Sequence, residues 1–237
     1  RFEENNKIFA CGCGKGGGFN SIPRKEFTQE TRVNHGKYNK DNKIIDFATG
    51  NTNNSLILNE NGEIFAVGLN QDNFLRIQGL EKNSIKFPLK LNLNLNIKVV
   101  SMSISNKNCY IIDTSGELYG IGDNSRSQIL GDPDEEVERW TKIDLPEGCR
   151  RFLQCANGER YLICLVENDK GEGSLYARGI NTNHECGIKE NEDNYIKKLT
   201  QCDETQNLNF KYIATRNSRS AAITVGGELY IWGIKYE

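Results

Sequence analysis

The chain has 237 residues, of which 37% are hydrophobic and 26% are charged. Its 30 basic and 32 acidic residues give a formal net charge of −2, so there is no basic excess of the kind that direct nucleic-acid binding usually needs. No apolar run approaches the roughly 18 residues of a membrane-spanning helix, and we expect no membrane insertion. The length is sufficient to bury a sizeable core.

The first four residues read Arg-Phe-Glu-Glu. They include no initiator Met, and no basic stretch followed by an apolar one, which is the pattern of an export signal. We therefore interpret the chain as a piece of a longer protein. We expect that protein to be intracellular, either cytoplasmic or nuclear.

The eight cysteines fit a reducing compartment. Several of them, such as Cys109 and Cys164, lie within apolar runs, where a reduced thiol behaves as a small hydrophobic group. The one close pair is Cys11 and Cys13, and no histidine follows it at metal-ligand spacing. The spacing predicts structural cysteines and no metal site.

The first segment that suggests chemistry is the run from Gly12 to Gly18, which places glycines around Lys15. A phosphate-binding P-loop would continue with Ser or Thr and open a helix. Here Phe19 follows, and the repeat described next already accounts for Gly12. We expect no phosphate site and no bound cofactor.

A short pattern recurs five times along the chain. Each copy reads aliphatic, aromatic, small or aliphatic, any residue, glycine, and the copies occupy residues 7–12, 63–68, 117–122, 174–179 and 228–233. The aromatic column consists of Phe9, Phe65, Tyr119, Tyr176 and Tyr230, and the closing glycines are Gly12, Gly68, Gly122, Gly179 and Gly233. The closing glycines are 54 to 57 residues apart. Five copies at near-constant spacing indicate an internal repeat.

Each copy is expected to be one strand of a β-hairpin. Aromatic and aliphatic side chains favour strands, and pairs such as Asn61-Gly62 and Ser115-Gly116 favour the tight turn before the block. Upstream apolar runs at 56–58, 110–112, 162–165 and 221–223 supply the other strand of each hairpin.

A further apolar segment precedes each hairpin, at residues 44–47, 97–100, 151–153 and 212–214. Each repeat therefore holds at least three strands and has room for a fourth. No window shows a sustained period of 3.6 residues. An all-β protein made of repeated, short-stranded units is typical of a β-propeller.

The block is followed by an Asn and then by a triplet of the Gly-Gln-Leu type, as in Gly122-Asp123-Asn124 leading to Ser127-Gln128-Ile129. This arrangement resembles the regulator of chromosome condensation repeat. The resemblance implies a propeller of seven blades, of which about four to five are present, and a single, incomplete domain over residues 1–237. The Trp of the family's repeat occurs only as Trp232, and its His position holds Asn54, Asn108 and Arg219.

No catalytic arrangement stands out. The two histidines, His35 and His184, do not lie in a nucleophile motif. The carboxylates around 132–138 lack the regular spacing of a calcium-binding loop. We expect no catalytic residues, and the chain is interpreted as a non-enzyme.

Two charged segments are the candidate partner-binding sites. Residues 20–43 form a predicted loop with the basic residues Arg24, Lys25, Arg32 and Lys37, and the loop at 132–138 carries Asp134, Glu135 and Glu136. Together these segments would suit a protein partner of mixed charge. The alternative is that both are solvated linkers between strands.

The sequence therefore favours a protein-interaction scaffold, acting as a subunit or domain of a larger assembly. One alternative is the targeting module of a longer enzyme, such as a ubiquitin ligase or a kinase. The other is a guanine nucleotide exchange factor for a small GTPase, which is the activity implied by the resemblance. The near-constant repeat spacing leaves no clear room for the inserted hairpin that such exchange factors use.

Overall fold

The structure, a computed structural model, describes residues 10–12, 24–28, 43–50, 53–77, 84–131, 133, 137–189, 194–203 and 205–234. The described strands form antiparallel sheets in which each strand pairs with the next one along the chain. The predictions that concern Phe9, Arg32, Lys37, Asp134, Glu135 and Glu136 lie outside these residues.

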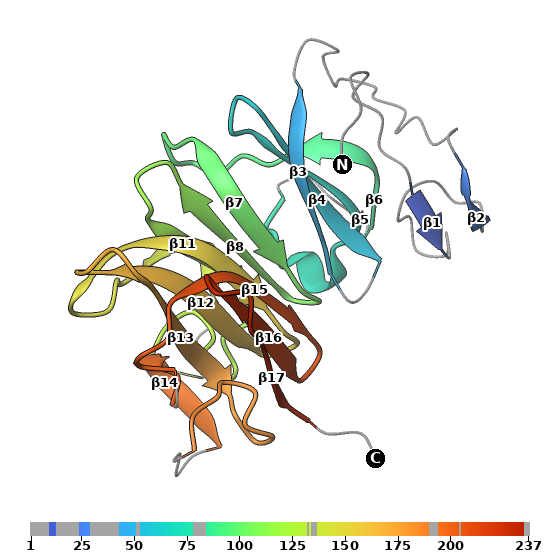
Figure 1. Ribbon diagram of the computed structural model, residues 1–237. Helices are drawn as coiled ribbons and strands as arrows, with labels where there is room; N and C mark the ends of the chain where they lie inside the picture. The colour runs from blue at the N-terminus through green and yellow to red at the C-terminus, as the bar shows by residue number, and fades with distance from the viewer. Residues whose placement is uncertain are drawn as a thin grey trace.

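Four consecutive sheets form four blades (Figure 1). Blade 1 contains β3 (Ile44–Thr49), β4 (Asn54–Asn59), β5 (Ile64–Leu69) and β6 (Ser84–Lys90). Blade 2 contains β7 (Val99–Ile104), β8 (Asn108–Asp113), β9 (Leu118–Gly122) and β10 (Val137–Ile143). Blade 3 contains β11 (Cys149–Asn157), β12 (Tyr161–Asn168), β13 (Gly173–Ile180) and β14 (Tyr195–Gln201). Blade 4 contains β15 (Phe210–Arg216), β16 (Arg219–Thr224) and β17 (Leu229–Gly233).

A shorter sheet precedes the blades, formed by β1 (Ala10–Gly12) and β2 (Arg24–Thr28). A 3-10 turn, η1 (Gln71–Asn73), follows β5. The all-β propeller arrangement predicted from the repeat is confirmed. The prediction that residues 1–237 make up one incomplete domain stays a prediction.

The predicted hairpins are confirmed by the strand register. In every blade the aromatic residue of the repeat pairs with the middle of the preceding strand, as in Phe65 with Ile57 and Tyr119 with Ile111. Gly62 and Gly116 have φ of +78° and +79°, which is the left-handed turn conformation expected of them. Blade 3 has a longer hairpin, and there Gly171, with φ of +81°, lies in the turn.

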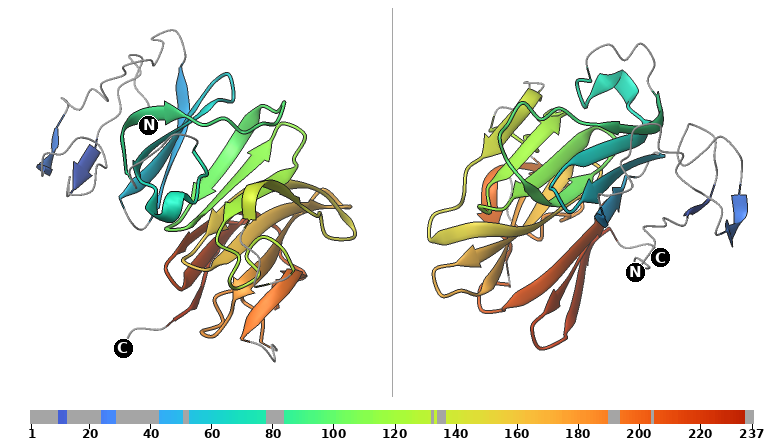
Figure 2. Two further views of the ribbon diagram at one scale, coloured as in Figure 1. Left: turned by 180° about the vertical axis from the view of Figure 1, so that it is seen from behind. Right: turned by 90° about the horizontal axis from the view of Figure 1, so that it is seen from above.

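The first strands β3, β7, β11 and β15 lie next to one another along the inner side of the arc of blades (Figures 1 and 2). The second and third strands of blades 1 to 3 are buried on both faces. All six residues of β4 and all six of β8 are buried. The core therefore consists of the layers between blades, as a propeller requires.

Three apolar clusters fill these layers. Leu58 and Ile64 of blade 1 pack with Met102 of blade 2, and Ile112 of blade 2 packs with Phe152 of blade 3. Between blades 3 and 4 the cluster includes Ile163, Leu175, Phe210 and Ile213. Each fully buried aliphatic or aromatic side chain of this kind contributes about 1.5–3 kcal/mol to the hydrophobic stabilisation.

The outward face of blade 4 differs from the same face of the preceding blades. Leu229 is 61% exposed and Ile231 is 67% exposed, whereas the equivalent residues of blade 3, Leu175 and Ala177, are completely buried. A Cβ at Gly116 would lie 2.4 Å from Cβ of Arg151 in the next blade, but a Cβ at the equivalent Gly227 would meet nothing within 4 Å. No described residue covers this face.

One predicted loop contains a strand. Residues 20–43 were expected to be a continuous loop, but Arg24 and Lys25 belong to β2, which pairs with β1 through Gly12↔Arg24 and Ala10↔Thr28. β2 is polar and pairs with one strand only, so its sequence shows no alternation of apolar residues. The sequence of this segment therefore resembles that of a loop. Within the described residues, no helix is long and apolar enough to cross a membrane.

Candidate interaction surface

The closing glycines fix the start of the connection that leaves the third strand of each blade. Gly68 and Gly122 have φ of +101° and +113°, and a Cβ at either position would lie 2.0 Å from a backbone carbonyl oxygen of the turn between the first two strands. The amide that follows each glycine donates to that same carbonyl, at 3.0 Å in Leu69→Asn53 and Asp123→Lys107. Gly179 and Gly233 repeat the arrangement. Only glycine fits this close approach without displacing the turn.

A buried asparagine shapes each of these connections. Asn70, Asn124 and Asn181 are at most 1% exposed. The Asn70 side-chain oxygen accepts a hydrogen bond from the Leu75 amide at 3.0 Å, and Asn124 accepts from Ile129 at 2.8 Å. Asn181 accepts from the Cys186 amide at 2.9 Å. The same side chain thus satisfies buried backbone donors in three blades, and the loop backbone is held in one conformation.

The residue three positions after each asparagine is left-handed although it is not glycine. Asn73, Ser127 and His184 have φ of +50°, +58° and +59°. In the regulator of chromosome condensation repeat, which this sequence resembles, the same position is the glycine of the Gly-Gln-Leu triplet. The left-handed turn is therefore kept where the glycine has been replaced, at a cost of about 1–2 kcal/mol per residue.

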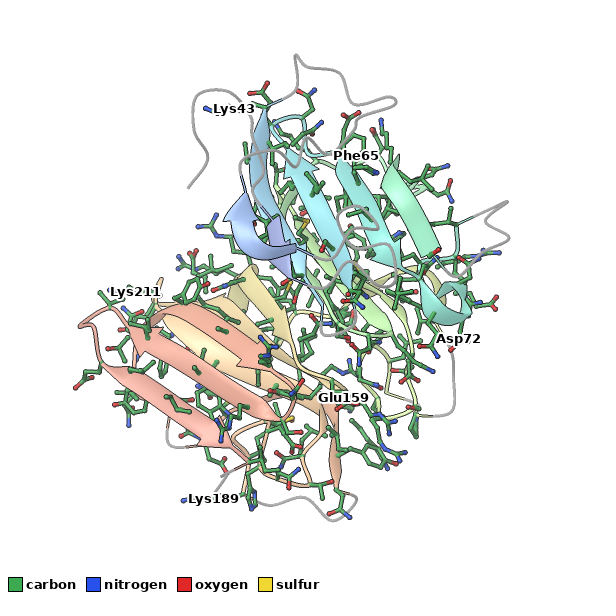
Figure 3. The ribbon with its side chains drawn as sticks, turned by 90° about the vertical axis from the view of Figure 1, so that its right-hand side faces the viewer. Lys43, Phe65, Asp72, Glu159, Lys189 and Lys211 are labelled. Carbon is green, nitrogen blue, oxygen red and sulfur yellow. The ribbon has the colours of Figure 1, made fainter. Side chains whose placement is uncertain are left out.

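The frame presents short tips that differ from blade to blade. They consist of the two residues after each asparagine: Gln71 and Asp72, Ser125 and Arg126, and Thr182 and Asn183. All except Asn183 are exposed. Figure 3 shows Asp72 on the side of the molecule that also bears Glu159, away from Lys43 and Lys211. We call this end of the blades, with its three connections, the loop end.

Neighbouring blades are joined at the loop end by two side chains. Each occupies the position of the Trp in the repeat, immediately before the closing glycine. Trp232 of blade 4 donates its indole N–H to the Glu185 carbonyl of blade 3 at 2.9 Å. Arg178 of blade 3 donates to the Ser127 and Ile129 carbonyls of blade 2 at 2.6 and 2.7 Å. Arg178 thus performs the bridging that Trp232 performs one blade further along.

Amide side chains add further cross-blade bridges. Gln154 of blade 3 both donates to the Ile213 carbonyl, at 3.0 Å, and accepts from the Ile213 amide, at 2.9 Å. Asn54 of blade 1 donates to the Ser105 carbonyl of blade 2 at 2.8 Å. Because each bridge satisfies backbone groups of the adjacent blade, the relative positions of the blades are fixed by directional bonds as well as by packing.

The described titratable groups form no nucleophilic or metal-binding centre. The six described cysteines are free, and all except Cys149 are buried. Burial raises the pKa of the Cys155 thiol to about 12 and raises those of Cys109 and Cys164 well above the ordinary value, so these thiols are neutral near pH 7. In the described part of the chain, no group of three or more His, Cys, Asp or Glu side chains is placed to hold a metal.

The predicted site residues divide into two sets. The described residues of the aromatic column lie one to each third strand, with Phe65 buried and Tyr119, Tyr176 and Tyr230 half-buried, and Gly68 and Gly122 near the ends of their strands are buried. Of the charged residues proposed for partner binding, only the backbones of Arg24 and Lys25 are described, and their role stays a prediction. Sequence reasoning missed Arg178 and the exposed tips. The signal for the tips was the Gly-x-Asn pattern itself, which marks where each connection begins.

Comparison with known proteins finds similarity to proteins of the regulator of chromosome condensation type. No family model matches it. It is 28% identical over 224 residues to the mitochondrial RCC1 domain-containing protein RUG3 of Arabidopsis thaliana, covering 92% of this chain and 48% of that protein. It is 24% identical over 196 residues to the guanine nucleotide exchange factor SRM1 of Saccharomyces cerevisiae, covering 81% of this chain and 39% of that protein.

The fold similarity is consistent with these relatives. The crystal structure of Prp20p from Saccharomyces cerevisiae, reported together with its binding properties to Gsp1p and histones, matches with a TM-score of 0.75 and 20% identity. The match covers 98% of this chain and 55% of Prp20p. The chain therefore spans about half, or less, of the length of the proteins it matches. The predicted resemblance to the regulator of chromosome condensation repeat is confirmed.

Proposed function

We propose that this propeller of the regulator of chromosome condensation type is a non-enzymatic protein-interaction platform, which binds its partner at the loop end. The observation that supports the proposal is a repeated, buried frame that carries exposed tips of different sequence. The frame residues Asn70, Asn124 and Asn181 are alike, whereas the tips present an acid at Asp72, a base at Arg126 and a neutral residue at Thr182. Rigid scaffolds with variable exposed loops are a usual basis for specific recognition.

The platform is held rigid across its blades, which favours binding. A partner that contacts several tips at once gains affinity only if their relative positions are already set, because ordering them on binding costs free energy. The bridges made by Arg178, Gln154 and Trp232 set those positions before binding.

The test compares two variants of the full-length protein purified from its native cells under gentle conditions. The first changes the tips by Asp72→Asn, Arg126→Gln and Thr182→Ala; Asn is chosen for Asp72 because it tolerates the φ of +57° at that position. The control changes Lys170→Ala and Glu172→Ala, which are exposed in the β12–β13 hairpin at the opposite end.

We expect a stoichiometric partner, identified by mass spectrometry, that co-purifies with the wild type and the control and is lost from the tip variant. Equal recovery with all three proteins, or no stoichiometric partner with the wild type, would contradict the proposal.

Guanine nucleotide exchange is the second candidate function, because one relative is named as an exchange factor. A small GTPase that co-purifies in stoichiometric amount and is released by added GTP would make exchange the function to pursue. The accompanying assay measures release of a fluorescent GDP analogue from that GTPase, with and without the propeller. A stable set of structural subunits that do not respond to nucleotide would favour the platform alone.

A further inference from the structure

The first strand of every blade contains an irregularity at the same place. The register of β3 with β4, β7 with β8, β11 with β12 and β15 with β16 shifts by one residue directly after a buried residue of the first strand; β11 also has a second shift, at Arg150, nearer its start. The extra residues are Ile45, Val100, Leu153 and Lys211. A β-bulge leaves its extra residue outside the ladder and redirects the side chain. The four side chains therefore occupy equivalent positions on the inner strands.

Three of these four residues are exposed aliphatics. Ile45 is 43% exposed, Val100 46% and Leu153 38%, although the residue just before each of them is buried. The fold does not need an apolar side chain at this position, because Lys211 occupies it in blade 4 and is exposed. Exposed apolar residues that recur side by side, where folding does not call for them, indicate a contact surface.

The same strip is basic, in contrast to the chain as a whole. Lys43 and Lys98 come immediately before the buried residues that start β3 and β7, and Arg150 and Arg151 lie just ahead of Phe152 in β11. The four first strands contain one acidic residue, Asp46. Burial raises the pKa of its carboxyl group.

Several of these cations have no carboxylate partner within the described residues. Lys43, Lys98 and Lys211 are exposed, and none of the ion pairs found in the described part of the chain includes them. Two acidic residues at the same end are paired with other lysines, Glu63 with Lys90 at 2.5 Å and Glu117 with Lys142 at 2.6 Å. A third, Glu60, lies beside the strip, and its carboxylate accepts from the Lys43 backbone amide at 3.4 Å. The strip therefore combines exposed lysines that form no ion pair within the described residues with exposed aliphatic surface.

The strip is continuous because the inner strands are neighbours. β3 contacts β7, β7 contacts β11 and β11 contacts β15. Figure 3 shows Lys43 and Lys211, at the two ends of the strip, on the same side of the molecule and away from Asp72 and Glu159. We call this strip the inner wall; it consists of Lys43, Ile45, Lys98, Val100, Leu153 and Lys211.

We propose that the inner wall binds an extended, acidic segment of a protein partner that carries aliphatic side chains between its carboxylates. The aliphatic groups would cover Ile45, Val100 and Leu153, and the carboxylates would pair with the lysines. A nucleic-acid strand is the alternative occupant, because the exposed aromatic residues Phe47 of β3 and Tyr212 of β15 offer rings on which bases stack. The aliphatic side chains of Ile45, Val100 and Leu153 favour the peptide, and the test decides between the two. The inference adds a second surface to the proposed function and does not involve the tips of the loop end.

The test measures fluorescence anisotropy of a labelled peptide that alternates glutamate with leucine, using the purified full-length protein. One matched probe alternates glutamate with serine and another alternates lysine with leucine. The charge variant is Lys98→Gln with Lys211→Gln, and the apolar variant is Val100→Ser with Leu153→Ser. The control variant is Lys189→Gln, an exposed lysine outside the inner wall (Figure 3).

We expect the glutamate–leucine peptide to bind the wild type and the control equally, and the charge variant about tenfold more weakly, since two exposed ion pairs are lost. We also expect binding to weaken as salt is added, and both matched probes to bind poorly. Equal affinity for the wild type and both variants, equal binding of the glutamate–serine probe, or tighter binding of single-stranded oligouridine would overturn the inference. Because the assay contains no loop-end partner, that failure would leave the proposed function untouched.

Discussion

The Arg178 guanidinium of blade 3 donates to the Ser127 carbonyl of blade 2 at 2.6 Å, across the boundary between two repeats. It also donates to the carbonyls of Ile129 and Lys197, each at 2.7 Å. Its three partners are neutral oxygens, and the residue is only 6% exposed. Desolvation lowers the pKa of the guanidinium, but arginine stays charged in proteins. Arg178 is therefore a buried cation held by backbone carbonyls of two blades.

Replacing Arg178 should destabilise the propeller. Arg178→Met keeps much of the apolar stem but leaves three carbonyl groups without their donor, and we expect a loss of about 2–4 kcal/mol in the free energy of unfolding. Urea unfolding measures the change from the shift in midpoint. The matched control is Arg160→Met, an exposed arginine in the β11–β12 turn, for which we expect a change within about 0.5 kcal/mol. Equal midpoints for the two variants would show that the bridges contribute nothing.

The closing glycines should be the least tolerant positions of the repeat. Gly122→Ala places a Cβ 2.0 Å from the Lys107 carbonyl oxygen in a residue with φ of +113°. We expect a loss above about 3 kcal/mol, because the turn must move as well as adopt a strained backbone. Gly171→Ala separates the two effects, since Gly171 has φ of +81° and nothing within 4 Å of the added Cβ. That variant should lose about 1–2 kcal/mol from the backbone alone, and equal losses in both variants would argue against the close approach.

Much of the blade could be predicted from local sequence pattern. The third strand of each blade combines an aromatic column with a turn glycine, and this signal located β5, β9, β13 and β17. The second strands were found because they are buried on both faces and contain unbroken apolar runs, as in Leu56-Ile57-Leu58. These strands lie between neighbouring strands of their own blade, and their composition reflects that burial.

The outer strands and the site depended on information that local sequence does not carry. β14 has one buried residue, Ile196, and contains the exposed Lys197 and Lys198, so its sequence does not distinguish a strand from a loop. β2 pairs with β1, which lies outside residues 20–43. The sequence of residues 20–43 alone therefore predicts a loop at Arg24 and Lys25. In the sequence, Arg178 is recognisable only as the residue that occupies the position of Trp232 in its own repeat. Its partners Ser127 and Ile129 belong to another repeat, and sequence alone does not bring them together.

Restoring a glycine at one left-handed position should stabilise the protein. His184 is exposed and has φ of +59°, and its ring makes one long hydrogen bond, between Nδ1 and the Ile188 carbonyl at 3.4 Å. His184→Gly therefore removes backbone strain at the loss of one weak contact. We expect a gain of about 0.5–1 kcal/mol, the strain relieved being partly offset by the larger entropy of glycine in the unfolded chain. The control is Thr182→Gly in the same connection, which has no positive φ to relieve and should lose about as much. The midpoints of thermal unfolding of the two variants should move in opposite directions. A lower midpoint for His184→Gly than for the wild type would contradict the presence of backbone strain at this position.

The buried thiols should make the protein less stable at high pH. Burial raises the pKa of Cys155 to about 12 in the folded protein, whereas an unfolded cysteine ionises near about 8.5. Between these values the unfolded state releases protons that the folded state retains, so the free energy of unfolding falls as pH rises. Cys155→Ala removes one such group and should reduce the slope by up to about 1.4 kcal/mol per pH unit. Urea unfolding between about pH 8.5 and 10 measures the slope, and the two proteins should share one slope below about pH 7.5, where the thiol is protonated in both states. Identical slopes throughout the alkaline range would show that Cys155 ionises as readily in the folded protein as in the unfolded chain.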